Sequence, residues 1–215
     1  MGNVLSAPTE GNWAHAVYED YFVQLAEAGF TNVRIPVDFY SGGFLNADYG
    51  LNGSQRSSIN IDDCTDNSCF SSNSNTASNY NGSLDDYQVN QEYLDRVQQI
   101  VDWAITHNII VVLDFHGNNL KQQFVYTFQN EQINGVNYYT NPTSAKRLAD
   151  INRFKALWKD IANRFKDYSN DQLVFDIINE PYFSISANEM DELNLEVIST
   201  IRSTGSNNLT RSIII

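Results

Sequence analysis

Basic residues are scarce in this sequence, whose 215 residues include 13 Lys and Arg against 26 Asp and Glu, for a formal charge of −13. Nucleic-acid-binding proteins take much of their affinity from phosphate neutralisation by Lys and Arg, so this balance argues against nucleic acid as a partner. Long apolar runs are also missing: none approaches the roughly 20 residues that a membrane-spanning helix needs. The first residues do not form a charged-then-apolar leader. We therefore expect no membrane partner.

Cysteine is almost absent, and the two cysteines lie close together in an Asn-, Ser- and Asp-rich segment. Cys64 and Cys69 either close a small disulfide loop, which would indicate an oxidising compartment, or are two free surface thiols. They are too few for a structural zinc site, since no histidine lies nearby in sequence. The acidic stretch 62–67 matches a calcium-binding loop poorly, because the glycine and the distal glutamate are missing. We expect no metal site.

The remaining composition is that of a folded domain, with 42% apolar and 13% aromatic residues. A chain of this length is expected to form a single domain over residues 1–215. Its aromatic and Asn side chains suit neutral ligands such as sugars. Residues 41–86 are rich in Ser, Asn, Gly and Asp with little periodicity. We interpret them as a loop insertion, because the alternation of strand and helix resumes unchanged after them.

Hydrophobic periodicity predicts alternating helices and strands. The expected helices cover 17–28, 89–107, 144–168 with Leu148 turned inward, and a stretch bearing Met190, Leu193, Val197 and Ile201 that ends at Gly205; the expected strands cover 32–37, 109–115, 173–181 and 211–215. Such alternation predicts an α/β fold with an all-parallel sheet, either doubly wound or a barrel. The continuous apolar run of 109–115 predicts burial on both faces. No glycine-rich phosphate fingerprint follows the first strand, which weakens a dinucleotide-binding interpretation.

Polar residues gather just after the strand ends, at 36–40, 116–119 and 179–182. Barrel enzymes place their chemistry at this end of the sheet. Arg34 adds a charge on the face opposite Val33, Ile35 and Val37. Three successive strands therefore present polar groups at one end, which predicts a functional site there.

Glu180 is the candidate general acid, because partial burial at the end of an apolar strand would raise its pKa. Asn179 would donate to a sugar hydroxyl, Arg34 would hold a second carboxylate ionised, and His116 would hydrogen-bond to substrate. Together these residue types indicate cleavage of a glycosidic bond.

Each residue also has a structural interpretation. Arg34 would form a buried ion pair, His116 would be a satisfied core histidine, and 179–181 would be a polar turn. His15 and His107 are expected to be incidental, since His15 falls in a loop and His107 falls at a helix C-terminus that favours a cation.

Three segments resemble successive hallmarks of glycoside hydrolase family 5, the cellulase family A: Gly29–Val37, Leu113–Gly117 and Ile178–Pro181. Residues 2–5 are similar to the end of that family's first barrel strand. The resemblance covers nearly the whole chain. It implies a (β/α)8 TIM barrel that is incomplete, with about strands 2–5, their helices and the end of strand 1.

The resemblance also implies retaining hydrolysis of a β-1,4-linked glucan by a cellulase-like endoglucanase that needs no cofactor. A β-mannanase or exo-β-glucanase on the same scaffold is the alternative enzyme, and a non-catalytic glucan-binding or remnant fragment is the alternative outside catalysis. By the resemblance, Glu180 is the acid/base, Asn179 contacts the sugar, Arg34 supports the nucleophile and His116 is an active-site histidine. Trp13 is either a sugar-stacking platform or a packing residue.

The family's nucleophile lies on the seventh strand, and no glutamate after Glu180 matches it: Glu189, Glu192 and Glu196 all fall on the last predicted helix. We expect little or no hydrolase activity from the chain alone. Its open sheet edges are expected to pair with the missing half-barrel or with another copy. A polymeric substrate cannot enter a cell, so a secreted protein is expected.

Overall fold

The computed structural model describes residues 4–7, 10–11, 13–39, 89, 91–117, 120–121, 124, 128, 132–133, 136–137 and 145–215. The loop insertion predicted at 41–86 lies outside the described residues, and so do Cys64 and Cys69.

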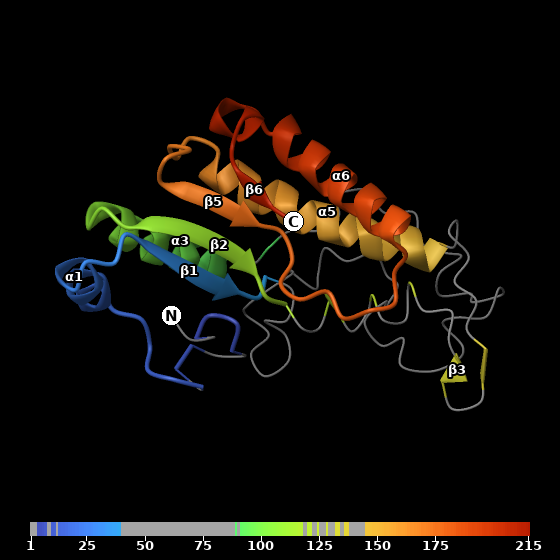
Figure 1. Cartoon of the computed structure of the whole chain (residues 1–215), viewed down its shortest axis with the longest axis horizontal. Helices are drawn as coiled ribbons and strands as arrows, with labels where there is room; N and C mark the ends of the chain where they lie inside the picture. Colours follow the sequence, from blue (N-terminus) through green and yellow to red (C-terminus); the bar gives the residue numbers. More distant parts are fainter. Residues whose placement is uncertain are drawn as a thin grey trace.

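Four parallel strands form the centre of the described structure: β1 (Asn32–Val37), β2 (Ile110–Phe115), β5 (Leu173–Asp176) and β6 (Ile213–Ile214). They lie in the sheet in the order in which they occur in the chain, with their arrowheads pointing the same way in Figure 1. Leu5 adds an isolated parallel bridge to Val37 on the outer side of β1. A doubly wound sheet would reverse its strand order at a switch point, whereas a barrel adds strands in sequence. The sheet is therefore part of a (β/α) barrel.

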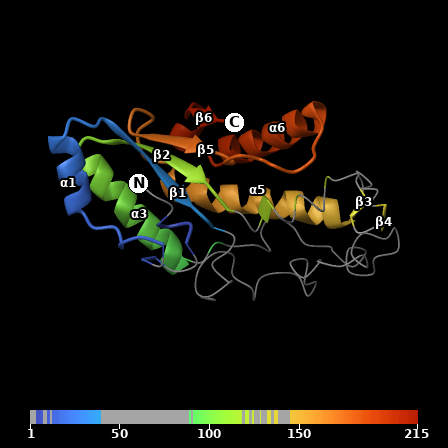
Figure 2. The ribbon, with the colours of Figure 1, turned by 60° about the horizontal axis from the view of Figure 1, so that its bottom comes forward.

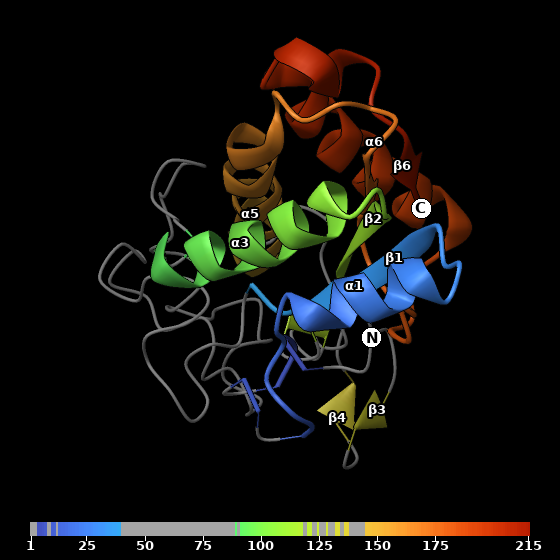
Figure 3. The ribbon, with the colours of Figure 1, turned by 90° about the vertical axis from the view of Figure 1, so that its left-hand side faces the viewer.

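Among the described residues, these strands are connected and covered by the helices α1 (Asp20–Glu27), α3 (Gln91–Thr106), α5 (Ala145–Phe165) and α6 (Ala187–Ser203). Figures 2 and 3 show α1 beside α3, and in Figure 3 α3 and α5 lie on the same side of β1 and β2. A short 3-10 helix (Ser206–Leu209) precedes β6, and a two-stranded antiparallel hairpin of β3 (Gln132–Ile133) and β4 (Val136–Asn137) was not predicted. The predicted alternation of helix and strand is confirmed.

The two faces of the sheet differ in polarity. One face is apolar, and every side chain on it is at most 6% exposed: Val33, Ile35, Val37, Val111, Leu113, Phe115, Leu173 and Phe175. These residues belong to the same core as Val97, Ile100, Trp158 and Phe165 from α3 and α5. The other face carries Arg34, Asp114 and Asp176.

The prediction that residues 109–115 are buried on both faces is wrong. Ile110 is 40% exposed and Val112 is half-buried. Both belong to the polar face, which faces the interior of the barrel instead of a helix layer. The apolar run therefore marks a strand packed against helices on one face only.

Both predicted glycine stops are confirmed. Gly29 follows α1 with φ +84° and Gly205 follows α6 with φ +76°, a backbone region that glycine enters without a steric penalty. A capping box starts α6: Ser186 Oγ accepts from the Glu189 backbone N–H, and the Glu189 carboxylate accepts from the Ser186 backbone N–H at 3.0 Å.

One inward position was predicted wrongly. Leu148 is 49% exposed, although the apolar residues Phe154, Trp158, Ile161 and Phe165 on the same helix are buried. The first turns of α5 extend past the carboxyl ends of the strands in Figure 1. The buried face of these turns carries Arg147 and Asp150, and Arg147 lies over the Phe128 ring, so Leu148 falls on the outer flank of the helix.

Candidate active site

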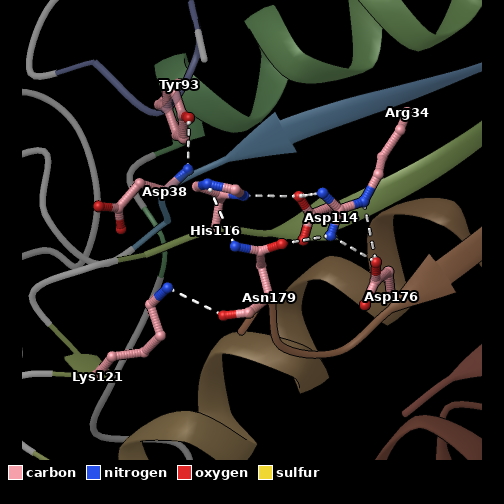
Figure 4. A network of polar contacts seen from close by, with 8 residues as sticks. All are labelled: Arg34, Asp38, Tyr93, Asp114, His116, Lys121, Asp176 and Asn179. Atoms are coloured by element: carbon pink, nitrogen blue, oxygen red, sulfur yellow. Dashed lines mark hydrogen bonds and ion pairs between the residues drawn. The ribbon is translucent and has the colours of Figure 1, made fainter. Parts of the chain in front are cut away.

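Arg34 forms the centre of the polar face. Its Nη1 lies 3.1 Å from Asp114 Oδ2, and its Nη2 lies 2.8 Å from Asp176 Oδ2, to which Nε donates at 3.1 Å. Figure 4 shows the guanidinium between the two carboxylates. Arg34 lies on β1, and the two aspartates lie on β2 and β5. The ion pairs therefore link three neighbouring strands. The strand alternation that placed Arg34 opposite the aliphatic residues is confirmed.

A closed cycle of hydrogen bonds extends from Arg34 to the candidate residues after the strands. Asn179 Oδ1 accepts from Arg34 Nη2 at 2.8 Å, and Asn179 Nδ2 lies 3.3 Å from His116 Nε2. His116 Nδ1 lies 2.9 Å from Asp114 Oδ2. A carboxylate accepts, so Nδ1 of the ring carries the proton and Nε2 accepts from the amide. Both ring nitrogens of His116 are thereby engaged within the protein.

Asp114 is the most buried member of the cycle, with no exposed surface, and its Oδ1 has no hydrogen-bond partner within the described part of the chain. Burial raises the pKa of Asp114, whereas its hydrogen bond with His116 and the charge of Arg34 lower it. The ionised form of this carboxyl group therefore depends on the guanidinium beside it.

Glu180 directly follows this network but is not part of it. β5 ends at Asp176, so the strand predicted to reach residue 181 is shorter, although Asn179 N still donates to Phe115 O at 2.9 Å. Glu180 has φ +44°, in the left-handed region that costs a non-glycine residue roughly 1–3 kcal/mol. The turn directs its side chain outward, and Glu180 is exposed. The expected partial burial of Glu180 is therefore wrong, because the chain leaves the apolar layer before reaching it.

The structure brings Arg34, His116 and Asn179 into direct contact, with Glu180 next in the chain. Trp13 is 57% exposed in the N-terminal segment and is not part of this network within the described residues. His107 Nε2 lies 3.2 Å from Glu19 Oε1, a contact between the end of α3 and the start of α1. His15 is exposed.

Sequence reasoning missed three residues: Asp114, Asp176 and Lys121. Asp114 and Asp176 each interrupt an apolar strand at an inward position of the polar face, in register with each other. A charge inside a buried strand is rare enough to have singled them out. Lys121 is 2% exposed, and its Nζ donates to Asn179 O at 2.9 Å. No pattern in the sequence indicated it.

Among the described residues, no group of three or more His, Cys, Asp or Glu side chains is arranged to hold a metal ion. Within the same residues, no helix combines the length and hydropathy needed to cross a bilayer.

The family model described as cellulase, glycosyl hydrolase family 5, matches residues 3–215. The chain belongs to glycoside hydrolase family 5. This protein of family 5 is 28% identical to Endoglucanase H of Acetivibrio thermocellus. The matched region covers all of this chain and 17% of the length of the relative. It is 25% identical to Endoglucanase A of Paenibacillus barcinonensis over all of this chain and 44% of the relative.

Solved structures give the same result for the fold. A tri-modular GH5 (subfamily 4) endo-beta-1,4-glucanase from Bacillus licheniformis matches all of this chain with a TM-score of 0.67 and 28% identity, over 31% of its own chain. A GH5-4 broad specificity endoglucanase from Clostridium acetobutylicum matches 99% of this chain with a TM-score of 0.64 and 27% identity, over 51% of its own. The chain therefore spans about half or less of the length of these relatives.

Proposed function

We propose that this family 5 protein is a retaining glycosidase that hydrolyses β-1,4-linked glucan in the manner of an endoglucanase, with Glu180 as its general acid/base. One observation carries the proposal: an exposed carboxylate on a left-handed turn directly follows Asn179. The Asn179 side-chain amide is bonded to Arg34 and His116, and its backbone is bonded to Phe115 and Lys121. Membership of family 5 and the endoglucanase names of its relatives support the choice of substrate.

In this proposal Glu180 protonates the glycosidic oxygen as the bond breaks and later removes a proton from the attacking water. Asn179 supplies a donor to the sugar, because an amide NH₂ has two hydrogens and only one is directed at His116. His116 holds Asn179 in this orientation, since both of its ring nitrogens are occupied. Arg34 orients the other side of the amide and balances the two aspartates.

Retaining hydrolysis needs a second carboxylate about 5 Å from the first, on the opposite face of the sugar. We infer that this nucleophile is a glutamate outside residues 1–215, and that the 215-residue chain by itself has little or no activity. The completing strands would come from the other half of a barrel or from self-association through the sheet edges. Trp13, with its exposed ring, is proposed as a stacking platform for a sugar. The proposed site of action is extracellular, where polymeric glucan is found.

The test is a substrate panel with protein expressed from the whole reading frame of the gene. Soluble cellulose derivatives should be hydrolysed with a rapid loss of viscosity, and Glu180→Gln should lower kcat by about 10²–10⁴-fold, the usual contribution of acid–base catalysis. Glu192→Gln, which changes an exposed glutamate on α6, is the matched control and should leave kcat unchanged.

Two results would reject the proposal. Hydrolysis of mannan without hydrolysis of cellulose derivatives would identify a β-mannanase on the same scaffold. Binding of glucan with no turnover in any variant would favour a non-catalytic function.

A further inference from the structure

Lys121 contacts the backbone next to Glu180, and the proposed mechanism does not use it. Its side chain is 2% exposed, and its Nζ donates to the backbone oxygen of Asn179 at 2.9 Å. Figure 4 shows the lysine reaching this carbonyl from the segment after β2. The same Nζ lies 5.5 Å from the centre of the Tyr182 ring, which is 55% exposed. Lys121 therefore contacts the chain on both sides of Glu180.

The hydrogen bond fixes the peptide that joins Asn179 to Glu180. The N–H of Asn179 donates to Phe115 O at 2.9 Å, and its C=O accepts from Lys121, so both backbone polar groups of this residue are fixed. Glu180 then takes φ +44°, a conformation that a non-glycine residue holds only when its surroundings impose it. Lys121 contacts the peptide that leads into this turn.

The charges that act on Lys121 also indicate an interaction with Glu180. Burial lowers the pKa of Lys121, and the Glu180 carboxylate is the strongest of the charges that raise it again, followed by Asp114 and Asp38, while Arg34 lowers it. A buried ammonium group needs an anion nearby, because water no longer screens its charge. The exposed carboxylate of Glu180 is the anion that can change its charge during hydrolysis.

We propose that Lys121 is a positioning residue for Glu180: it holds the 179–180 peptide and couples its own positive charge to the charge of the Glu180 carboxylate. This inference rests on the proposed function for its catalytic meaning. The coupling is a property of the folded chain and does not require turnover.

The test measures the charge of Lys121 directly, by NMR titration of its side-chain nitrogen in protein expressed from the whole reading frame. Glu180→Gln removes an exposed carboxylate, so the fold should be kept. The midpoint of the Lys121 titration should fall by about half a pH unit or more, as expected for loss of an opposite charge close by. Glu192→Gln removes one negative charge from the outer helix α6 and should leave the midpoint unchanged. An unchanged midpoint in Glu180→Gln, or an equal shift in both variants, would overturn the coupling.

The positioning role is tested with protein from the whole reading frame. Lys121→Met keeps the length of the side chain but loses the donor and the charge, and should lower kcat at least tenfold with little change in KM and displace the alkaline limb of the pH profile. Lys155→Met, which removes a lysine paired with Glu196 on the helices, should change neither. A Lys121→Met profile identical to that of the parent enzyme would overturn the role.

The outcomes separate the two proposals. If Lys121→Met does not fold, the NMR titration in Glu180→Gln still decides the coupling. If no variant and no parent protein hydrolyses any β-glycan, the proposed function fails, while a shifted Lys121 midpoint would still establish the coupled pair.

Discussion

Replacing Arg34 by Met should destabilise the protein through the two aspartates that it leaves behind. Arg34 contacts Asp114 and Asp176 at 3.1 and 2.8 Å, and both aspartates are buried. Removing one partner of a buried ion pair costs about 3–5 kcal/mol, because the other charge stays buried and unpaired. The Arg34 side chain is 41% exposed, so solvent screening lowers the expected loss to about 2–3 kcal/mol.

A loss of this size should be visible as a fall in Tm of about 4–12 °C for a protein of this length. It should also depend on pH in a defined direction. Without Arg34, burial acts unopposed by the guanidinium and raises the pKa of Asp114 further above its usual value. A carboxyl group whose pKa is higher in the folded state binds its proton more tightly there. The difference in stability between the variant and the parent should therefore shrink as the pH falls from 7 toward 4.5.

Thermal unfolding followed by circular dichroism at both pH values measures this effect. Lys155→Met is the control, because its ion pair with the exposed Glu196 is worth less than about 1 kcal/mol. Asp114→Asn in the Arg34→Met background should recover part of the lost stability, since it removes the unpaired charge. A loss below 1 kcal/mol, or a loss that grows at acid pH, would refute the reasoning.

Three further predictions concern the scaffold and are checked by urea or thermal unfolding. Arg211 has no exposed surface, burial lowers its pKa to about 10, and it donates to the carbonyl oxygens of Leu173, Phe165 and Tyr168. Arg211→Met should cost about 3–5 kcal/mol by leaving these buried acceptors unpaired, and a loss below 1 kcal/mol would contradict this. Ser186→Ala should cost about 1 kcal/mol by removing the N-cap of α6. The Ser186 hydrogen bond lowers the pKa of Glu189, so this contribution should be present at neutral pH and lost as the pH falls through that lowered pKa; an effect independent of pH would argue against it. Gly117→Ala should cost about 1–3 kcal/mol, because a Cβ there would lie 2.7 Å from both Asp38 Oδ1 and the Phe115 ring; an unchanged Tm would show that these neighbours can move.

The fold was predictable because its signals are local and repeated. The spacing of the apolar residues predicted whether each main element is a helix or a strand, and the glycines at positions 29 and 205 predicted two helix ends. The parallel direction of the strands followed from the alternation of helices and strands, whereas this alternation left their order in the sheet open between a doubly wound fold and a barrel. The exposure of Leu148 was not predictable, since the buried face of the first turns of α5 carries the polar residues Arg147 and Asp150, which an apolar pattern does not reveal.

The site was predictable in its parts but not in its connections. His116 and Asn179 stood out as polar residues after strand ends and Arg34 as a charge within a strand, and the three do form one network. The roles of Asp114 and Asp176 depend on a strand register that places two distant segments side by side. Lys121 could not be identified, because a lysine in a polar segment is ordinarily solvated and only the tertiary structure buries it.

The left-handed turn at Glu180 also escaped prediction. The apolar run before it indicated that the strand would continue to Pro181, but the strand pairing ends at Asp176. The Glu180 carboxylate is exposed on a turn that follows the Asn179 carbonyl bonded by Lys121, which is a different environment from the apolar strand end expected from the sequence.

The central claim, that Glu180 is the acid/base of a retaining β-glucanase, is tested most directly by the dependence of hydrolysis on the leaving group. Protein from the whole reading frame with Glu180→Ala should hydrolyse cellulose derivatives at least about 10²-fold more slowly than the parent. It should still form its glycosyl intermediate from an aryl β-cellobioside with an acidic phenol, which leaves without protonation. Added azide should then yield the β-configured cellobiosyl azide. An unchanged rate on cellulose derivatives, or an azide product of inverted configuration, would contradict the account.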